Sequence, residues 1–556
     1  MRTRRHAATP LSRPDPVGGF VVELGVAAEM LRLRPVRPSQ TLKSMTIQRE
    51  LATRRSDLTL FAGHPNGLGV LFFAEMWERF SYYGMRALLV LFMVAPQSEG
   101  GLGFTPAEAA LIYGNYTMAV YLLSIPGGVA ADVSLGLWRA VLIGGLIIAS
   151  GHFTLAIGET ATFYVGLVLV VIGTGLFKPA VSALVGTLYA RDDSRRDAGF
   201  SIFYMGINIG GFLAPLATGF LAQSPVMKTW LADSGFDPAG SWHWGFAAAG
   251  VGMLAGLAVL LIFGRDVAKA EARTAIEAQA ALEEQGRAKE SLSPLLKLVT
   301  VVAGTLGALA LLVLSDRPGF EPLRWAYVLV PAALAVWLGF SKDEEKRRYG
   351  AMFVLLIGAI LFWGIFEQAG LTIALFADQL TRSEFAGWSF PSAWFQSLNP
   401  LFVILLAPLF AALWMRLGDR QPSTPVKFGA GLVFLALSFL LMVPAATLTA
   451  EGRISPLWLV GLFFLQTVGE MFLSPVGLST MTKLAPRRAV AFVLGIWLLG
   501  FALGSKLAGV LGSNFTATNP DALAWSFLWQ AGLAAAMAVL FFVLTPWVKR
   551  LMGGVR

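Results

Sequence analysis

The sequence predicts an all-α, polytopic membrane protein with about 14 transmembrane helices. The chain has 556 residues, of which 56% are hydrophobic and 14% charged, and its mean hydropathy is +0.66. Soluble domains carry about 25% charged residues. Apolar runs of roughly 20 residues, the length that crosses a hydrocarbon core, recur from Leu68 to the end of the chain. A membrane β-barrel would show short alternating segments instead.

The first 60 residues differ from the rest of the chain. They are rich in Arg, Pro, Ser and Thr and contain no long apolar run, so we expect residues 1–60 to form a disordered cytoplasmic tail. The weakly apolar stretch 18–31 contains Glu23 and Glu29, and it begins too late for a signal peptide. A short regulatory helix, or a true start at Met45, is the alternative.

Apolar spans then follow in two groups of six, separated by a polar connection and two weaker apolar runs. The first six lie at about 68–95, 107–131, 138–158, 161–187, 199–222 and 243–264. The connection, 265–290, is helical by propensity, and the weaker runs lie at about 294–314 and 325–340. The last six lie at about 350–376, 391–415, 427–446, 456–482, 488–511 and 523–547. The run at 325–340 is short, so 12 crossings with a non-spanning middle pair are the alternative.

Basic residues favour one side of this arrangement. The loops on the side of the N-terminus carry Lys and Arg, whereas the opposite loops carry few and the loop 96–106 carries none. The positive-inside rule therefore predicts a multi-pass protein of the cytoplasmic (inner) membrane with both termini in the cytoplasm. The net charge of +9 collects in these loops and does not indicate a nucleic-acid partner. We expect a six-helix bundle at 61–265, the connection and two extra helices at 266–348, and a second six-helix bundle at 349–556.

A polar stripe runs through the first span. On a helix its residues fall at positions i, i+3, i+4, i+7, i+8 and i+11, which is one continuous face. The stripe consists of Glu75, Glu78, Arg79, Tyr82, Tyr83 and Arg86. Charge that faces lipid is costly, so this face is predicted to line a water-filled cavity or to contact another helix.

The two halves carry intramembrane groups of opposite character. The first half contributes the cations Arg79, Arg86 and Lys178, and the second contributes Glu367, Asn399 and Glu470. A cavity between them would have one positive and one negative wall, which suits a zwitterion such as a peptide or an amino acid. Aromatic side chains, among them Tyr83, Tyr121 and Trp497, are candidates for side-chain pockets. Lys506 is a further intramembrane cation that we expect to be functional, whereas we interpret His152 as structural.

The sequence argues against an enzyme. It contains no cysteine, no HExxH metal motif and no GxSxG nucleophile motif, and its intramembrane polar residues are spread over seven spans. No catalytic residue, metal site or cofactor is therefore predicted.

Four separated motifs carry a family resemblance. The order of six, two and six spans, with the loop motif of Gly128, Asp132, Gly136 and Arg139, resembles the major facilitator superfamily. Within it, the stretches 75–84, 177–179, 203–208 and 469–475 resemble the proton-dependent oligopeptide transporter family over about residues 62–548. Its bacterial members also have two extra helices between the halves. Thr174 and Ala180 stand where the family often has Asn, which leaves the substrate preference open.

The resemblance implies proton-coupled import of di- and tripeptides across the membrane by alternating access. We expect the protein to work as a monomer. The resemblance also implies that the peptide carboxylate meets Arg79, Arg86 and Lys178, and that the amino terminus meets Asn208, Asn399 and Glu470. It implies a pocket lined by Tyr82, Tyr83, Tyr121, Glu367 and Trp497. Glu75 and Glu78 would couple to protons, with protonation of one carboxylate freeing Arg79 for the peptide.

Two charge pairs between the halves are predicted to act as gates. These are Arg86 with Glu367 and Lys178 with Glu470, each forming and breaking as the cavity opens to one side and then the other. The alternative functions are import of another small anion or zwitterion, such as nitrate or an amino-acid derivative, and drug export on the same fold. The two Glu residues of the stripe and Glu470 favour a ligand that carries an ammonium group.

Overall fold

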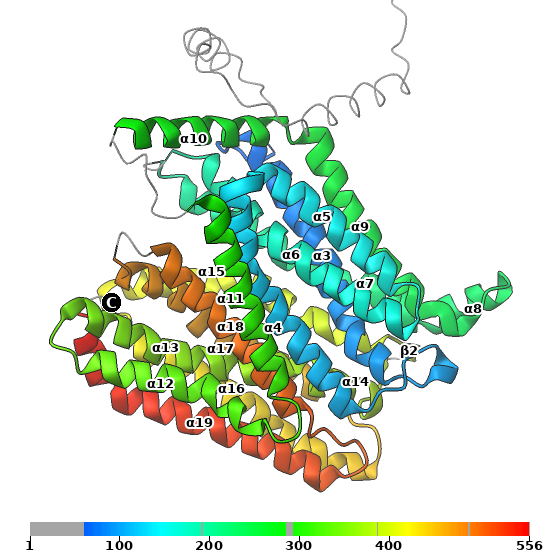
Figure 1. Ribbon diagram of the computed structural model, residues 1–556. Helices are drawn as coiled ribbons and strands as arrows, with labels where there is room; N and C mark the ends of the chain where they lie inside the picture. The colour runs from blue at the N-terminus through cyan, green and yellow to red at the C-terminus, as the bar shows by residue number, and fades with distance from the viewer. Residues whose placement is uncertain (1–59, 191–192, 285–292, 386, 487–489, 555–556) are drawn as a thin grey trace, which may run out of the picture.

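Long helices make up most of the chain in the computed structural model (Figure 1). The structure describes residues 60–190, 193–284, 293–385, 387–486 and 490–554. The predicted tail and the alternative start at Met45 therefore lie outside the described residues, apart from Leu60. The prediction of an all-α membrane protein is confirmed.

The helix boundaries lie within seven residues of those of the predicted spans. The first six spans are α3 (Asn66–Val94), α4 (Pro106–Ala130), α5 (Leu137–Leu155), α6 (Thr160–Thr187), α7 (Arg196–Gln223) and α9 (Ser241–Phe263). The middle segment forms α10 (Arg265–Glu284), α11 (Pro294–Leu314) and α12 (Ala326–Gly339). The last six spans are α13 (Glu344–Phe366) with α14 (Thr372–Gln379), α15 (Leu398–Leu417), α16 (Thr424–Leu448), α17 (Leu457–Leu484), α18 (Val490–Gly512) and α19 (Pro520–Leu551).

Twelve helices of the described chain are long and apolar enough to cross a membrane. The two other predicted spans differ from these for separate reasons. Helix α3 has 29 residues but carries the charged stripe, and α12 has only 14 residues. At 1.5 Å per residue α12 is ~21 Å long, against a hydrocarbon core of ~30 Å.

The predicted span 350–376 is not one continuous helix, which corrects that expectation. It breaks at a 3₁₀ turn, η6 (Glu367–Gly370), and Leu371 leaves the helical region with φ −119° and ψ −102°. The side chain of Gln396 donates to the backbone oxygen of Ala369, which satisfies one carbonyl freed by the break. The break places Glu367 at the end of α13, and α14 continues from there as a separate short helix.

Two small elements at one end of the molecule were not predicted from the hydropathy pattern. One is the short helix α8 (Pro225–Asp233), and the other is a hairpin of β1 (Glu384–Phe385) and β2 (Trp388–Ser389). We call this end, where α3 ends and α4 begins, the outer end. Helix α10 lies across the opposite end of the first bundle (Figure 1), where Glu271 accepts the backbone N–H of Leu137 at the start of α5, at 2.5 Å.

Small residues allow the helices to pack closely, as in other membrane bundles. A Cβ atom on Gly144 of α5 would lie 2.7 Å from the carbonyl oxygen of Gly173 on α6, and the reverse distance is also 2.7 Å. Between the halves, Gly114 of α4 faces Gly509 of α18, where a Cβ on Gly114 would lie 2.7 Å from the Gly509 Cα. These positions leave no room for a side chain.

The extra helices α11 and α12 are joined to both bundles. Helix α11 packs on α4 of the first bundle, and α12 packs on α13 of the second. Lys506 of α18 is 1% exposed, and its Nζ donates to Asp316, between α11 and α12, at 2.5 Å and to Asn115 of α4 at 2.6 Å. Asn115 also donates to Asp316, at 2.9 Å. Lys506 therefore has structural partners rather than a place among the charged groups described below.

Candidate functional site

The polar stripe of α3 faces the interior of the protein. Glu75, Glu78 and Arg79 are each 2% exposed or less, Tyr82 is also buried, and Arg86 is half-buried. One helix face thus brings two carboxylates, two guanidinium groups and two phenols to the inside, as the spacing predicts.

Arg79 is held by both carboxylates of the stripe. Its Nε and Nη2 donate to the two oxygens of Glu78, and its Nε lies 3.5 Å from Oε1 of Glu75. The guanidinium carbon also lies 4.9 Å from the ring centre of Tyr82. Oε2 of Glu75 is buried and has no hydrogen-bond partner. A negative charge on that oxygen would have no hydrogen-bond partner, and binding a proton there would neutralise the charge.

Arg86 joins the two halves near the outer end. Its Nη2 donates to Oε2 of Glu367 at 2.6 Å, and its Nε donates to the hydroxyl of Tyr113 at 2.5 Å. Tyr113 in turn donates to the same Glu367 oxygen at 3.2 Å. The Arg86–Glu367 pair is therefore formed in this conformation, while its role as a gate remains a prediction.

The other predicted gate pair is not formed. Lys178 lies 5.0 Å from the ring centre of Tyr121, and no ion pair or hydrogen bond of its ammonium group is found among the described residues. Glu470 instead accepts a hydrogen bond from Asn399 at 2.9 Å, and Asn399 also donates to Thr467 at 3.1 Å. A cation on the first half and a carboxylate on the second thus remain available to a ligand.

Asn208 and Trp497 are placed differently from the charged groups. Asn208 donates to the backbone oxygen of Tyr204, one turn earlier on its own helix, at 3.1 Å. Trp497 is 3% exposed, and its ring packs against Phe428 and Phe501 with ring centres 6.4 and 6.2 Å away. Both residues are inside the bundle, and their predicted contacts with the peptide stay predictions.

Three residues of the site were missed from the sequence, namely Tyr113, Thr467 and Phe501. The first could have been found, because Tyr113 and Tyr121 are spaced to share a face of α4. Phe501 stacks on Tyr121 with ring centres 5.4 Å apart, and it joins the two halves. Its contact depends on how α18 packs on α4, which no local pattern reveals.

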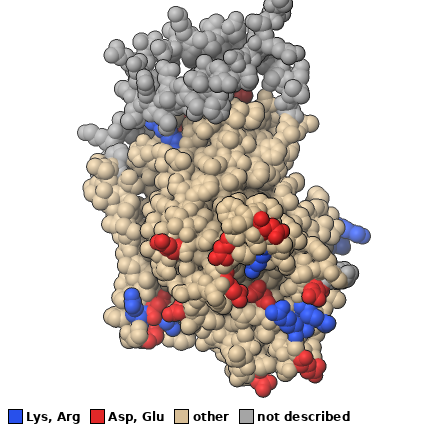
Figure 2. Space-filling view, turned by 90° about the vertical axis from the view of Figure 1, so that its right-hand side faces the viewer, with Lys and Arg blue, Asp and Glu red and all other residues tan. Residues whose placement is uncertain are grey.

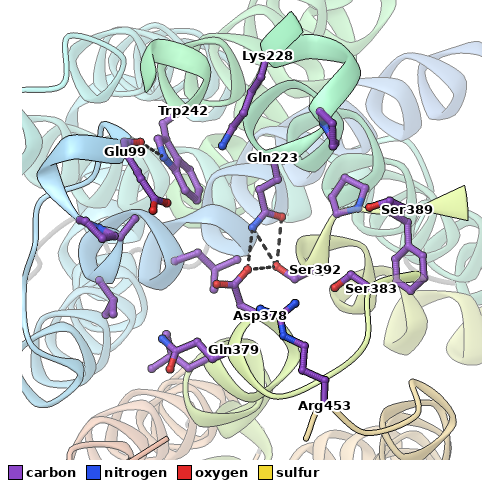
Figure 3. A pocket seen from close by; sticks show the side chains of 18 residues that line it. Glu99, Gln223, Lys228, Trp242, Asp378, Gln379, Ser383, Ser389, Ser392 and Arg453 are labelled. Carbon is purple, nitrogen blue, oxygen red and sulfur yellow. Dashed lines mark hydrogen bonds between the residues drawn. The ribbon is translucent and has the colours of Figure 1, made fainter. Parts of the chain in front are cut away.

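The hydrogen bonds between the halves lie toward the outer end. Gln223 of α7 donates to Asp378 at 3.3 Å and to Ser392 at 2.9 Å, and Ser392 donates to Asp378 at 2.6 Å (Figure 3). Nearby, the side chain of Ser397 donates to the backbone oxygen of Phe212 at 2.8 Å. Within the described residues, no hydrogen bond or ion pair joins the halves at the opposite ends. In this conformation the two halves are therefore held together, and the protein is closed, on the outer side.

No group of three or more His, Cys, Asp or Glu side chains in the described part of the chain is arranged to hold a metal ion. Among the charged groups, the first half contributes Arg79, Arg86 and Lys178 together with the carboxylates of Glu75 and Glu78, and the second half contributes Glu367 and Glu470.

Comparison with known proteins gives consistent similarities. Residues 138–525 match the model of the POT family. The chain is 39% identical to the peptide transporter YePEPT of Yersinia enterocolitica, with 88% of this chain and 96% of that protein covered. It is 35% identical to a di-/tripeptide transporter of Lactococcus lactis, with 89% and 98% covered. Among solved structures, a mutant of a peptide transporter POT in complex with alafosfalin is 39% identical, with a TM-score of 0.74 and coverage of 89% and 97%.

Proposed function

Because this chain belongs to the POT family of transporters, we propose that it imports di- and tripeptides together with protons by alternating access. A transporter family also agrees with the prediction that the chain is not an enzyme. Multiple membrane-spanning helices agree with a membrane location.

The observation that carries this proposal is the unpaired arrangement of Lys178 and Glu470. They belong to different halves, and the structure does not join them. A peptide with its carboxylate at Lys178 and its ammonium group at Glu470 would neutralise both and attract the two halves to each other. Transport by alternating access needs such a ligand-dependent closure, because a ligand shifts a conformational equilibrium only through different contacts in the two states.

The proton is proposed to act at the carboxylates around Arg79. Arg79 is held by Glu78 and approached by Glu75, so it is not free for a peptide carboxylate in this conformation. Protonation at this cluster would release the guanidinium toward the peptide. Peptide and proton together would then neutralise the charges of the cavity, and the proton would carry one positive charge inward. One proton moving through ~100 mV releases ~2.3 kcal/mol, which corresponds to about 50-fold accumulation of peptide.

The remaining predicted residues are assigned to the same site. Asn208, Asn399 and Glu470 are proposed to meet the amino terminus, and Tyr82, Tyr83, Tyr121, Glu367 and Trp497 to line the pocket. We further propose that the protein works as a monomer in the cytoplasmic membrane, with both termini in the cytoplasm. The excess of Lys and Arg in the loops of one side supports this orientation.

The test is uptake of labelled dialanine by proteoliposomes with an imposed pH gradient, acid outside. Uptake above the equilibrium level that collapses with a protonophore is the expected result. Equal uptake with and without the gradient would contradict proton coupling, and no uptake of any di- or tripeptide would contradict the proposed substrate.

Competitors separate the alternative substrates in the same assay. Unlabelled tripeptides and alafosfalin, which a similar transporter binds in its solved structure, are expected to reduce dialanine uptake. Nitrate and free amino acids are expected to leave it unchanged. Competition by nitrate would favour an anion importer, and expulsion of a drug against the pH gradient would favour an exporter.

A further inference from the structure

A cavity lined by charged side chains lies between the two halves at the outer end. Its volume is about 420 Å³, within the range of roughly 300–1,000 Å³ that is usual for small-molecule sites. The first half contributes the end of α3, the α7–α8 region and Trp242, and the second contributes α14, the hairpin region and Arg453. Figure 2 shows that acidic and basic side chains surround a hollow on this face of the molecule.

This cavity lies on the path outward from the Arg86–Glu367 pair. Leu91 and Val94, which line it, follow Arg86 along α3. Asp378, which also lines it, is on α14, the helix that continues beyond the turn carrying Glu367. A solute approaching the closed pair from outside would therefore pass through this cavity.

The hydrogen bonds among Gln223, Asp378 and Ser392, which join the two halves, lie in the lining of the cavity. Gln223 and Ser392 both bond to Oδ1 of Asp378, and no hydrogen bond to its Oδ2 is found among the described residues. The guanidinium of Arg453 points toward Asp378 in Figure 3. Opening the protein outward must break these hydrogen bonds, so a ligand bound in the cavity lies where the opening begins.

Four charged side chains line the cavity without pairing with one another. They are Glu99 and Asp378, which are acidic, and Lys228 and Arg453, which are basic. Within the described residues none of them takes part in an ion pair of 4 Å or less. Each half supplies one acid and one base. Two positive and two negative charges favour a ligand with both signs and no net charge over a simple anion or cation.

We propose that this cavity is an outer subsite that captures short zwitterionic peptides before the halves open. Lys228 and Arg453 receive the carboxylate, and Glu99 and Asp378 receive the ammonium group. The proposal rests on the proposed function, because it concerns the same substrates on their way to the central site. Charges at the mouth of a cleft raise the local concentration of a complementary ligand, and salt weakens the effect.

The experiment measures initial uptake of labelled dialanine by whole cells that produce the full chain, at increasing external concentration. The variants are the double variant Lys228→Gln/Arg453→Gln and the single variant Glu99→Gln. Two controls, Arg382→Gln and Asp233→Asn, remove the same kinds of charge from exposed outer positions that do not line the cavity. For the double variant, KM is expected to rise roughly tenfold, with the maximal rate within about twofold of the wild type, and the controls are expected to match the wild type.

Two further readouts separate capture from general damage. Higher salt is expected to raise the KM of the wild type and to leave that of the double variant unchanged. Dialanine exchange started from the cytoplasmic side of vesicles is expected to be equal for both, which also shows that the variant is folded. An unchanged KM, or a lower maximal rate with an unchanged KM, would overturn the subsite. If the wild type took up no dialanine at all, the proposed function itself would fail. That result differs from a failure of the subsite, in which the wild type takes up dialanine and the variants have the same KM.

Discussion

Arg79 and Lys178 are two intramembrane cations in opposite situations. Arg79 is bound by the carboxylate of Glu78 on its own helix, whereas the ammonium group of Lys178 lies over the ring of Tyr121 and has no ion pair with any residue that the structure describes. In a site that excludes water, an ion pair must be broken before its cation can bind a ligand, but an unpaired cation can bind at once. We therefore assign the first contact with the peptide carboxylate to Lys178 and the proton-dependent contact to Arg79.

Replacing Glu78 with Gln is expected to abolish accumulation driven by the pH gradient, because the neutral amide cannot take up the proton that is proposed to release Arg79. Exchange of labelled for unlabelled dialanine, which needs no net proton movement, should survive. Both rates can be measured in the same proteoliposomes, with Glu159→Gln, an exposed loop acid, as the control. Full gradient-driven uptake by Glu78→Gln would remove Glu78 from the coupling step.

Lys178→Gln tests the carboxylate contact. A hydrogen bond to a charged group contributes about 1.5–3 kcal/mol, so the KM for dialanine should rise between about 10- and 150-fold. The KM for dialanine amide, which lacks the carboxylate, should change much less. If both substrates lost affinity equally, the role of Lys178 would be general to the pocket and not specific to the carboxylate.

Among the elements, the inserted pair α11 and α12 stands out because it joins both bundles without belonging to either. Helix α11 lies on α4 and α12 lies on α13, and Asp316 between them binds Lys506 of α18 and Asn115 of α4. These bonds lie toward the outer end, where the halves are already in contact. The insert therefore supports the closed outer side in this conformation.

Lys506→Met is expected to destabilise the protein by about 3–5 kcal/mol, because it leaves the Asp316 carboxylate without its buried partner. The measurement is the midpoint of thermal unfolding in detergent. Replacing the three buried partners together, as Lys506→Met/Asp316→Leu/Asn115→Leu, should recover much of the loss, since apolar groups can substitute for a buried ion pair, and the partly exposed Arg324, 3.9 Å from Asp316, can turn to water. A triple variant less stable than Lys506→Met would contradict this account.

At the scale of the whole molecule, an ion pair and hydrogen bonds join the two halves toward the outer end only, within the part of the chain that the structure describes. Arg86–Glu367 and the hydrogen bonds of Gln223, Ser392 and Asp378 join the halves toward the outer end, whereas Lys178 and Glu470 deeper inside are not joined. This asymmetry is what alternating access requires of a state closed to the outside. Transport then needs the outer bonds to break while an inner contact forms.

The absence of native cysteine makes this motion directly testable. Gln223 and Ser392 are joined by a hydrogen bond of 2.9 Å, so cysteines at both positions should be linked by a short cleavable bifunctional reagent. Linking Gln223→Cys/Ser392→Cys is expected to stop dialanine uptake, and cleaving the reagent should restore it. The single variants, treated in the same way, should keep their activity. Uptake by the linked protein would show that this outer contact does not open during transport.

The sequence by itself determined the helices and the inward face of α3. Runs of about 20 apolar residues can span a bilayer only as helices, because the backbone must satisfy its hydrogen bonds internally. Charges at helical spacing in such a run cannot face lipid, so the direction of Glu75, Glu78 and Arg79 followed from the same argument.

The tertiary structure decided which of the two predicted charge pairs between the halves is formed, and which partner Lys506 has. Sequence spacing relates residues within one helix, but Arg86 meets Glu367, and Lys506 meets Asp316, through the packing of separate helices. The tertiary structure also decided that Lys178 and Glu470 stay apart, since the distance between them depends on which end of the molecule is closed. The break of the seventh span at Glu367 and the outer cavity depend on the same packing, because both lie where the two halves meet.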